Sequence, residues 1–115
     1  MKTTESFHLS LKESAYDLNA SGKEFTEFFA HGSLVVELYK PVKVDKQTPH
    51  TRDEAYIVVT GSGRFYNGGE YVDFVQGDFL FAKAGAIHRF EDFTEDFMTW
   101  VLFYGPKGGE KKFDV

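Results

Sequence analysis

The chain has 115 residues and a formal net charge of −5, and 42% of its residues are hydrophobic. These totals fit one domain with its own core, and the acidic balance argues against a nucleic-acid surface, which needs a basic patch. The sequence contains no cysteine, which excludes disulfides and thiolate metal sites, so any metal must be held by nitrogen and oxygen ligands.

Signals for membrane insertion or export are not recognisable in the sequence. No apolar run approaches the roughly 18 residues that a membrane-spanning helix needs. The N-terminal stretch MKTTESFHLSLKES has no uninterrupted apolar core of the kind found in signal peptides. We therefore expect a soluble cytoplasmic protein that binds neither membranes nor nucleic acid.

The N-terminal part of the chain predicts one short helix over residues 11–19. Ser10 is suited to cap its first turn, and Ser21-Gly22 is a typical stop. We expect one domain made of an N-terminal arm with this helix (1–23), a β core (24–106) and a C-terminal tail (107–115).

From residue 24 onward, short apolar and aromatic stretches alternate with turns, most of which contain glycine. Aromatic residues make up 17% of the chain, and their bulky side chains favour strands. Parallel strands would need connecting helices of about a dozen residues, for which the spacing leaves no room. We therefore predict an all-β fold of antiparallel strands, in a sandwich or barrel. The expected strands cover residues 24–29, 34–39, 54–60, 64–67, 71–75, 79–82, 88–93 and 97–104.

The strand over residues 54–60 begins with a candidate metal ligand. Side chains alternate along a strand, so Glu54, Tyr56 and Val58 share one face. If that face looks inward, Glu54 is a buried carboxylate, which needs a cation or strong donors nearby. His50 lies one short loop upstream and could reach the same point. Alone, such a His and Glu are more often ordinary surface residues.

A second histidine, His88, stands at the start of another predicted strand, after a glycine-containing turn. Two histidines and one carboxylate can occupy one face of an octahedral metal and leave positions open for water, substrate or dioxygen. Because the chain has no cysteine, Fe(II), Mn, Ni, Co and Zn remain candidates.

The spacing of these residues resembles the two motifs of the cupins, G-x5-H-x-H-x3-4-E-x6-G and G-x5-P-x-G-x2-H-x3-N. The resemblance extends over nearly the whole chain and implies an antiparallel jelly-roll barrel and a divalent metal ion. Cupins include dioxygenases, isomerases, lyases and decarboxylases, so the resemblance does not choose a reaction. The positions that match are His50, Glu54 and Gly61 in the first motif, and Gly77, Gly85 and His88 in the second.

Three positions depart from the motifs. Thr48 stands where the first histidine is expected, and Lys83 and Asp92 replace the proline and asparagine of the second motif. Gln47 could supply a carbonyl oxygen in place of the missing imidazole. Strict alternation would point Gln47 away from His50, but Pro49 could break the alternation with a bulge or kink. The other interpretation is a cupin shell that has lost its metal and retains a polar core.

Two functions follow as hypotheses. The first is a small metal-dependent enzyme of dioxygenase, isomerase or lyase type, acting on a small chelating substrate, in which Tyr56 donates a proton or orients the substrate. The second is a non-catalytic module that binds a metal or small molecule. In either case a homodimer is expected, because sheet edges and aromatic faces need cover. The aromatic residues expected in the core or a dimer interface are Phe79, Phe81, Phe90, Phe97, Trp100 and Phe103.

Overall fold

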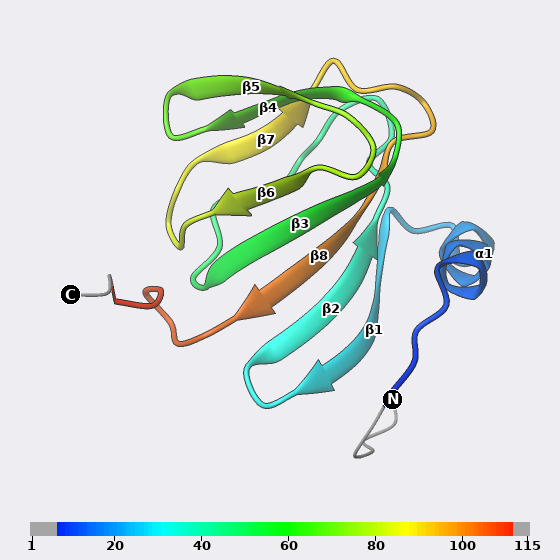
Figure 1. Cartoon of the computed structure of the whole chain (residues 1–115), viewed down its shortest axis with the longest axis horizontal. Helices are drawn as coiled ribbons and strands as arrows, with labels where there is room; N and C mark the ends of the chain where they lie inside the picture. The colour runs from blue at the N-terminus through cyan, green and yellow to red at the C-terminus, as the bar shows by residue number, and fades with distance from the viewer. Residues whose placement is uncertain (1–6, 112–115) are drawn as a thin grey trace.

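The structure is a computed structural model that describes residues 7–111. It contains one helix and eight strands, arranged as two sheets with the helix to one side (Figure 1). The elements are α1 (Leu11–Ser21), β1 (Phe25–His31), β2 (Leu34–Tyr39), β3 (Asp53–Thr60), β4 (Gly63–Asn67), β5 (Glu70–Phe74), β6 (Phe79–Ala82), β7 (His88–Glu91) and β8 (Met98–Tyr104).

The predicted N-terminal helix is confirmed, and it ends two residues later than expected. The Ser10 hydroxyl accepts a hydrogen bond from the Glu13 backbone N–H at 3.2 Å, which satisfies one of the free donors of the first turn. At the other end, Gly22 adopts a left-handed conformation (φ 70°), which glycine reaches without steric cost. The helix contacts β1 and β2 and buries Leu18 almost completely.

Every strand pair is antiparallel, as the sequence predicts. The larger sheet has the order β1-β2-β8-β3-β6, and the smaller sheet has the order β5-β4-β7. Strand β3 lies between β8 and β6, so its inward side chains face the space between the two sheets. The prediction of an antiparallel jelly-roll architecture with one short N-terminal helix is confirmed.

The core lies between the sheets and is largely aromatic. Phe65, Phe74 and Phe90 come from the smaller sheet, and Phe90 makes an edge-on contact with Tyr56 of the larger sheet, with ring centroids 5.0 Å apart. Such edge-to-face pairs add to the stability gained from apolar burial. Of the aromatic residues expected in the core or an interface, Phe90 and Phe97 lie in the core, whereas Phe79 and Phe81 are exposed on the outer face of β6.

Gly61, the glycine that follows Glu54 in the first motif, ends β3 for a steric reason. It has a φ of 85°, and a Cβ atom there would lie 2.6 Å from the Phe97 Cα. Only glycine permits both this conformation and this close approach. The turn therefore sets where β3 stops and how the chain enters the second sheet.

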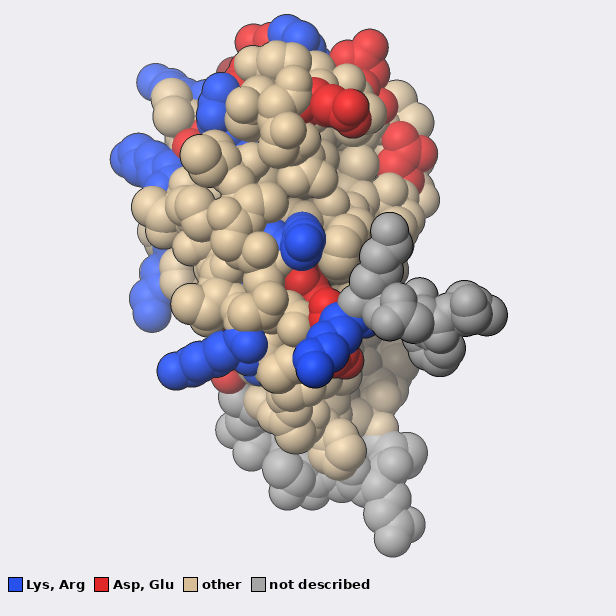
Figure 2. All heavy atoms as spheres, turned by 90° about the vertical axis from the view of Figure 1, so that its left-hand side faces the viewer, with Lys and Arg blue, Asp and Glu red and all other residues tan. Residues whose placement is uncertain are grey.

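The surface carries charges of both signs. On the face shown in Figure 2, Lys and Arg side chains are separated by uncharged and acidic ones and form no continuous basic area. Among residues 7–111, no helix has both the length and the apolar character that crossing a membrane requires.

Candidate metal centre

Glu54 projects from β3 toward the interior and is almost fully buried. Its neighbours in register are Ala82 on β6 and Phe103 on β8, and its relative exposure is 1%. The alternation along β3 places Glu54, Tyr56 and Val58 on this inner face, as predicted, and all three are buried. Because a buried carboxylate is costly without compensation, its partners identify the site.

His50 reaches Glu54 from the loop before β3. Its Nδ1 lies 2.6 Å from Glu54 Oε1. The backbone carbonyl of His50 accepts a hydrogen bond from the N–H of Gly85 at 2.8 Å, so the turn of the second motif holds the loop of the first. The two motifs, far apart in sequence, are thus joined at this point.

His88 approaches from the smaller sheet, at the first residue of β7. Its Nε2 lies 2.7 Å from Glu54 Oε1, and its Nδ1 lies 2.9 Å from the carbonyl oxygen of Ala86. The potential ligand atoms of His50, Glu54 and His88 all lie within 4.8 Å of one another. The three residues that the sequence analysis selected from separate segments therefore come together in space.

The arrangement of these atoms fits a cation better than it fits a set of hydrogen bonds. Among the described residues, His50 Nδ1 and Glu54 Oε1 are buried and have no hydrogen-bond partner, although they lie only 2.6 Å apart. A short distance is not a hydrogen bond unless the N–H points at the acceptor, so the two atoms lie side by side rather than donor to acceptor. Buried polar atoms without partners are rare in native proteins, and a shared cation would satisfy both.

The two ring nitrogens of His88 support the same conclusion. Nδ1 faces the Ala86 carbonyl, so it carries the proton and donates. Nε2 faces Glu54 Oε1 and, at 3.1 Å, Gln47 Oε1, and both of these are acceptors. Either a second proton or a metal ion must lie at Nε2. Donation of the other ring N–H to a backbone carbonyl is the usual arrangement of a metal-bound histidine.

The charges of the cluster support one another. Burial alone would raise the pKa of Glu54, but the adjacent imidazoles of His50 and His88 hold the pKa of this carboxyl below its usual range. Burial alone would lower the pKa of His88, but the Glu54 carboxylate and the Ala86 carbonyl raise it. Without a metal, the site therefore holds an anionic carboxylate beside the His88 imidazole, whose cationic form is favoured.

Gln47 lies at the same point, and a residue that the sequence analysis did not select holds it there. Asp45 is buried, with 8% relative exposure. It accepts hydrogen bonds from the Gln47 side-chain amide at 2.6 Å, the Phe90 backbone N–H at 2.8 Å and the Tyr39 hydroxyl at 2.5 Å. Since the Gln47 Nε2 is used by Asp45, its Oε1 is turned toward His88 and Tyr56. Nothing in the spacing of the sequence singles out Asp45.

Tyr56 is buried beneath the cluster, with no exposed surface. Its hydroxyl donates to Glu54 Oε2 at 2.9 Å and lies 3.3 Å from Gln47 Oε1. The bond to Oε2 leaves Oε1 for the two histidines. Burial, together with the neighbouring Glu54 carboxylate, raises the pKa of Tyr56 well above its ordinary value, so the phenol stays protonated and donates.

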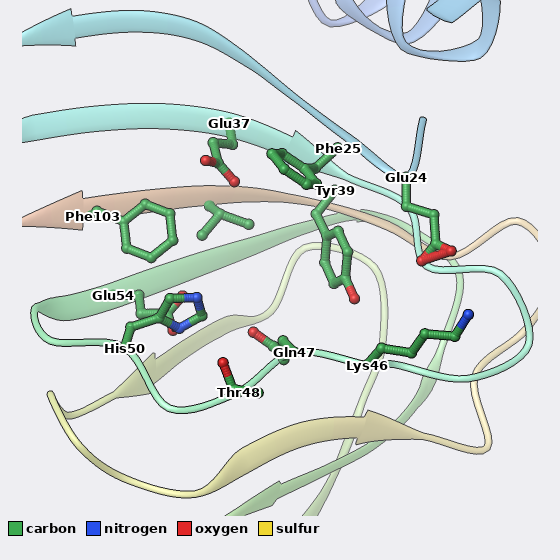
Figure 3. A pocket seen from close by; sticks show the side chains of 11 residues that line it. Glu24, Phe25, Glu37, Tyr39, Lys46, Gln47, Thr48, His50, Glu54 and Phe103 are labelled. Carbon is green, nitrogen blue, oxygen red and sulfur yellow. The ribbon is translucent and has the colours of Figure 1, made fainter. Parts of the chain in front are cut away.

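A pocket of about 540 Å³ opens above the cluster. Figure 3 shows His50, Gln47 and Thr48 on the loop along one side, with Glu37 and Tyr39 projecting from β2 on the opposite side. Thr48, which replaces the first motif histidine, lines this pocket. Glu37 was also missed by the sequence analysis, although a single acidic residue inside the apolar strand LVVELY was a usable signal.

Comparison with known proteins agrees with this architecture. The family described as "Cupin domain" matches residues 35–104. An uncharacterised protein of Streptomyces coelicolor, SCO3923, is 30% identical over 90 residues, which cover 76% of this chain and 86% of that protein.

Two solved structures share the fold at lower identity. KdgF from a Halomonas species is 20% identical with a TM-score of 0.62, and the match covers 72% of this chain and 78% of that chain. A chain from the crystal structures of the DMSP lyases RdDddP and RnDddQII is 24% identical with a TM-score of 0.62, covering 72% of this chain and 47% of that chain. The family match spans more than half of the sequence and includes all three clustered ligands, and the protein therefore belongs to the cupin domain family.

Proposed function

We propose that this cupin is a small metal-dependent enzyme of dioxygenase, isomerase or lyase type that acts on a small chelating organic molecule. His50, Glu54 and His88 would hold a divalent ion, and Gln47 Oε1 would be the fourth protein ligand. The observation that carries the proposal is the convergence of the three ligand atoms within 4.8 Å, with two of them buried and lacking hydrogen-bond partners.

The donor set limits the metal and its chemistry. Imidazole and carboxylate ligands without thiolate suit Fe(II), Mn, Co, Ni or Zn. Such an ion supplies Lewis-acid or redox chemistry to a substrate that enters its open positions.

The pocket supports a small organic substrate. Its volume of about 540 Å³ lies within the range of sites for small molecules, which are mostly apolar with a few convergent polar groups. Phe25, Val101 and Phe103 form the apolar part of the pocket wall, and His50 and Glu54 of the cluster also line the pocket. A substrate that reaches His50 and Glu54 would therefore leave most of its surface against apolar side chains.

Tyr56 and Asp45 act on the ligands in this proposal. Tyr56 donates to Glu54 Oε2, which fixes the carboxylate so that Oε1 is presented to the cluster. Asp45 fixes the Gln47 amide in the same way. These are positions of the kind that orient metal ligands and strengthen metal binding. A direct catalytic role of Tyr56 stays a prediction, and its complete burial favours positioning.

Metal analysis of the purified protein, with His88→Ala and His31→Ala variants, tests the proposal. His31 is exposed at the end of β1, so its replacement controls for nonspecific histidine binding. We expect one metal ion per chain in the parent and in His31→Ala, and none in His88→Ala. Failure of the parent to bind Fe(II), Mn or Ni after soaking would contradict the proposal. Stoichiometric metal with no turnover of chelating substrates would support the non-catalytic binding module instead.

A further inference from the structure

Glu37 lies on the same face of the larger sheet as Glu54, the cluster residue that this sheet contributes. It is opposite Val101 on β8, and Val101 is opposite Tyr56 on β3. Residues directly across a sheet share a face, so Glu37 lies on the same inner face as Tyr56. Strand β8 lies between their strands, β2 and β3. Figure 3 shows its carboxylate directed into the pocket, on the wall across from the His50 loop.

Within the described part of the chain, this carboxylate forms no ion pair. Among residues 7–111, the ion pairs involve Glu54, Asp73, Asp92 and Glu91, and none includes Glu37. A partly buried acid without a salt bridge is unusual, because burial disfavours the charged form. Its position on the wall of a substrate-sized pocket suggests a use other than stability.

The charged groups around Glu37 come from β1, β3 and the loop before β3. Glu27 faces it from β1, Glu54 from β3 and His50 from the loop before β3, while Glu24 and Lys46 line the same pocket. Burial raises the pKa of Glu37 to about 7, the negative charges of Glu27 and Glu54 add to this, and His50 opposes it. At neutral pH the side chain can therefore both accept and donate a proton, as a general acid–base residue must.

We propose that Glu37 is a catalytic acid–base residue that moves a proton to and from a carbonyl compound bound between β2 and the His50/Glu54/His88 cluster. The inference rests on the proposed metal-dependent function, which supplies an electrophile on the opposite wall. The substrate class is a small molecule with an acidic C–H bond beside a carbonyl group. Three acids and one lysine on the pocket walls, Glu24, Glu37, Glu54 and Lys46, favour a neutral or singly charged compound over a polyanion.

The proton transfer balances without an added oxidant or reductant. The Glu37 carboxylate takes the proton, the C–H bond breaks, and its electron pair becomes a C=C bond as the carbonyl π electrons move onto oxygen. The protonated Glu37 exchanges its proton with solvent and returns a proton to the same carbon, where the C=C electron pair forms the new C–H bond and the carbonyl group reforms. In an α-hydroxycarbonyl compound the proton can instead go to the former carbonyl carbon, while the α-hydroxyl passes its proton to the enolate oxygen and becomes the new carbonyl. The first outcome is exchange with solvent, and the second is isomerisation, so exchange is the simplest readout of the residue's function.

The experiment measures deuterium uptake from D₂O into acetylacetone, pyruvate and dihydroxyacetone by mass spectrometry, using protein loaded with Zn²⁺ or Ni²⁺. We expect Glu37→Gln to lower the exchange rate by about 100-fold or more, the usual contribution of a general acid–base group. Glu70→Gln, an exposed glutamate on β5 of the smaller sheet, is the matched control and should retain most of the rate. Carbon-13 NMR of the glutamate carboxyls in metal-free protein should show one resonance titrating near neutral pH that is missing from Glu37→Gln.

The outcomes separate the two proposals. If the parent protein binds no metal, the proposed function fails. If metal binds stoichiometrically but Glu37 titrates like an ordinary glutamate, the acid–base role alone is overturned. The same follows if no compound exchanges, or if Glu37→Gln exchanges them as fast as the parent. Slower exchange in Glu37→Gln with unchanged metal content supports the role and excludes an effect through the metal site.

Discussion

Two walls of one pocket carry the same residue type in opposite electrostatic settings. Glu54, on β3, is almost fully buried, yet its pKa is lowered because two imidazoles adjoin it. Glu37, on β2, is less buried, but burial and neighbouring acids raise its pKa to about 7. Depth therefore does not decide the charge of a carboxyl here; its partners do. Pairs of acids whose pKa values are shifted in opposite directions are typical of sites in which one acid stays ionised and the other exchanges protons.

The difference arises from the polar groups that surround the carboxylate on each wall. Glu54 has Tyr56 on one oxygen and the two histidines at the other, and Asp45 fixes the adjacent Gln47. Among the residues described, Glu37 has no comparable ion-pair partner. One wall is thus preorganised to hold a cation, and the other is free to change its protonation state.

The largest effect should come from disrupting this network at Asp45. In Asp45→Asn the amide nitrogen replaces one carboxylate oxygen, and each of the two oxygens accepts from an N–H donor: Oδ2 from Gln47 Nε2 and the Phe90 N–H, and Oδ1 from the Gln47 backbone N–H. We expect metal affinity to fall by about 10- to 100-fold, as for other residues that orient ligands. The free energy of unfolding should fall by about 1–3 kcal/mol, because a buried donor loses its partner. Isothermal titration with Mn²⁺ and urea unfolding measure the two quantities.

A double variant shows whether Asp45 acts through Gln47. If it does, Asp45→Asn should weaken metal binding much less in a Gln47→Ala background than in the parent. Equal losses in both backgrounds would mean that Asp45 only supports the fold. They would also remove the argument that the Gln47 amide is turned toward the cluster as a ligand.

The sequence predicted the centre of this network but not its support. His50, Glu54 and His88 could be found because their spacing matches two motifs and because strand alternation places Glu54 inward. Gln47 was harder to predict as a ligand, because strand alternation would point its side chain away from His50. The loop before β3 is irregular, and the bond to Asp45 turns the Gln47 amide toward His88. The contacts of Asp45 with Tyr39 and Phe90 join residues up to 45 positions apart, and no local pattern reports such a contact.

The same reasoning explains the fold. Strand and turn periodicity located the eight strands, because it depends on nearby residues, and the short connections excluded parallel pairing. Which strands pair, such as β2 with β8, depends on contacts between residues far apart in sequence. The sequence did not show which aromatic residues would be buried, because burial depends on what covers each face of a sheet. Phe90 lies between the sheets, whereas Phe79 is 64% exposed on the outer face of β6, beyond the strands that α1 contacts. Alternation predicts that two faces exist but not what covers each of them.

The contrast between the two glutamates also predicts opposite effects on stability in metal-free protein. A raised folded-state pKa means that the native state holds the Glu37 proton more tightly than the unfolded chain does. Stability then falls as pH rises from the ordinary glutamate value of 4.5 to about 7. Glu37→Gln removes this loss, so it should stabilise the protein at pH 8 by on the order of 1 kcal/mol after allowance for solvent screening, and by less at pH 5.

Glu54→Gln should behave in the opposite way. Its lowered pKa means that ionisation stabilises the native state above the ordinary glutamate range, and this contribution is lost as pH falls through the folded value. The variant should therefore be less stable than the parent at pH 7, with a smaller difference at low pH. Urea unfolding measures these differences, at pH 5 and 8 for Glu37→Gln, and at pH 8 and below the ordinary glutamate value of 4.5 for Glu54→Gln. Shifts of the same sign for the two variants would contradict the electrostatic contrast between the walls.

The Tyr56→Phe variant distinguishes positioning from catalysis. The change removes one buried hydroxyl and its bond to Glu54 Oε2, at a cost of about 1 kcal/mol in the free energy of unfolding. Freed of this bond, the carboxylate can rotate, and metal affinity should fall by about 10-fold, the lower end of effects for residues that orient ligands. If Tyr56 only positions Glu54, proton exchange at saturating metal should stay close to that of the parent. Loss of exchange with normal metal affinity would instead give the phenol a direct part in the reaction.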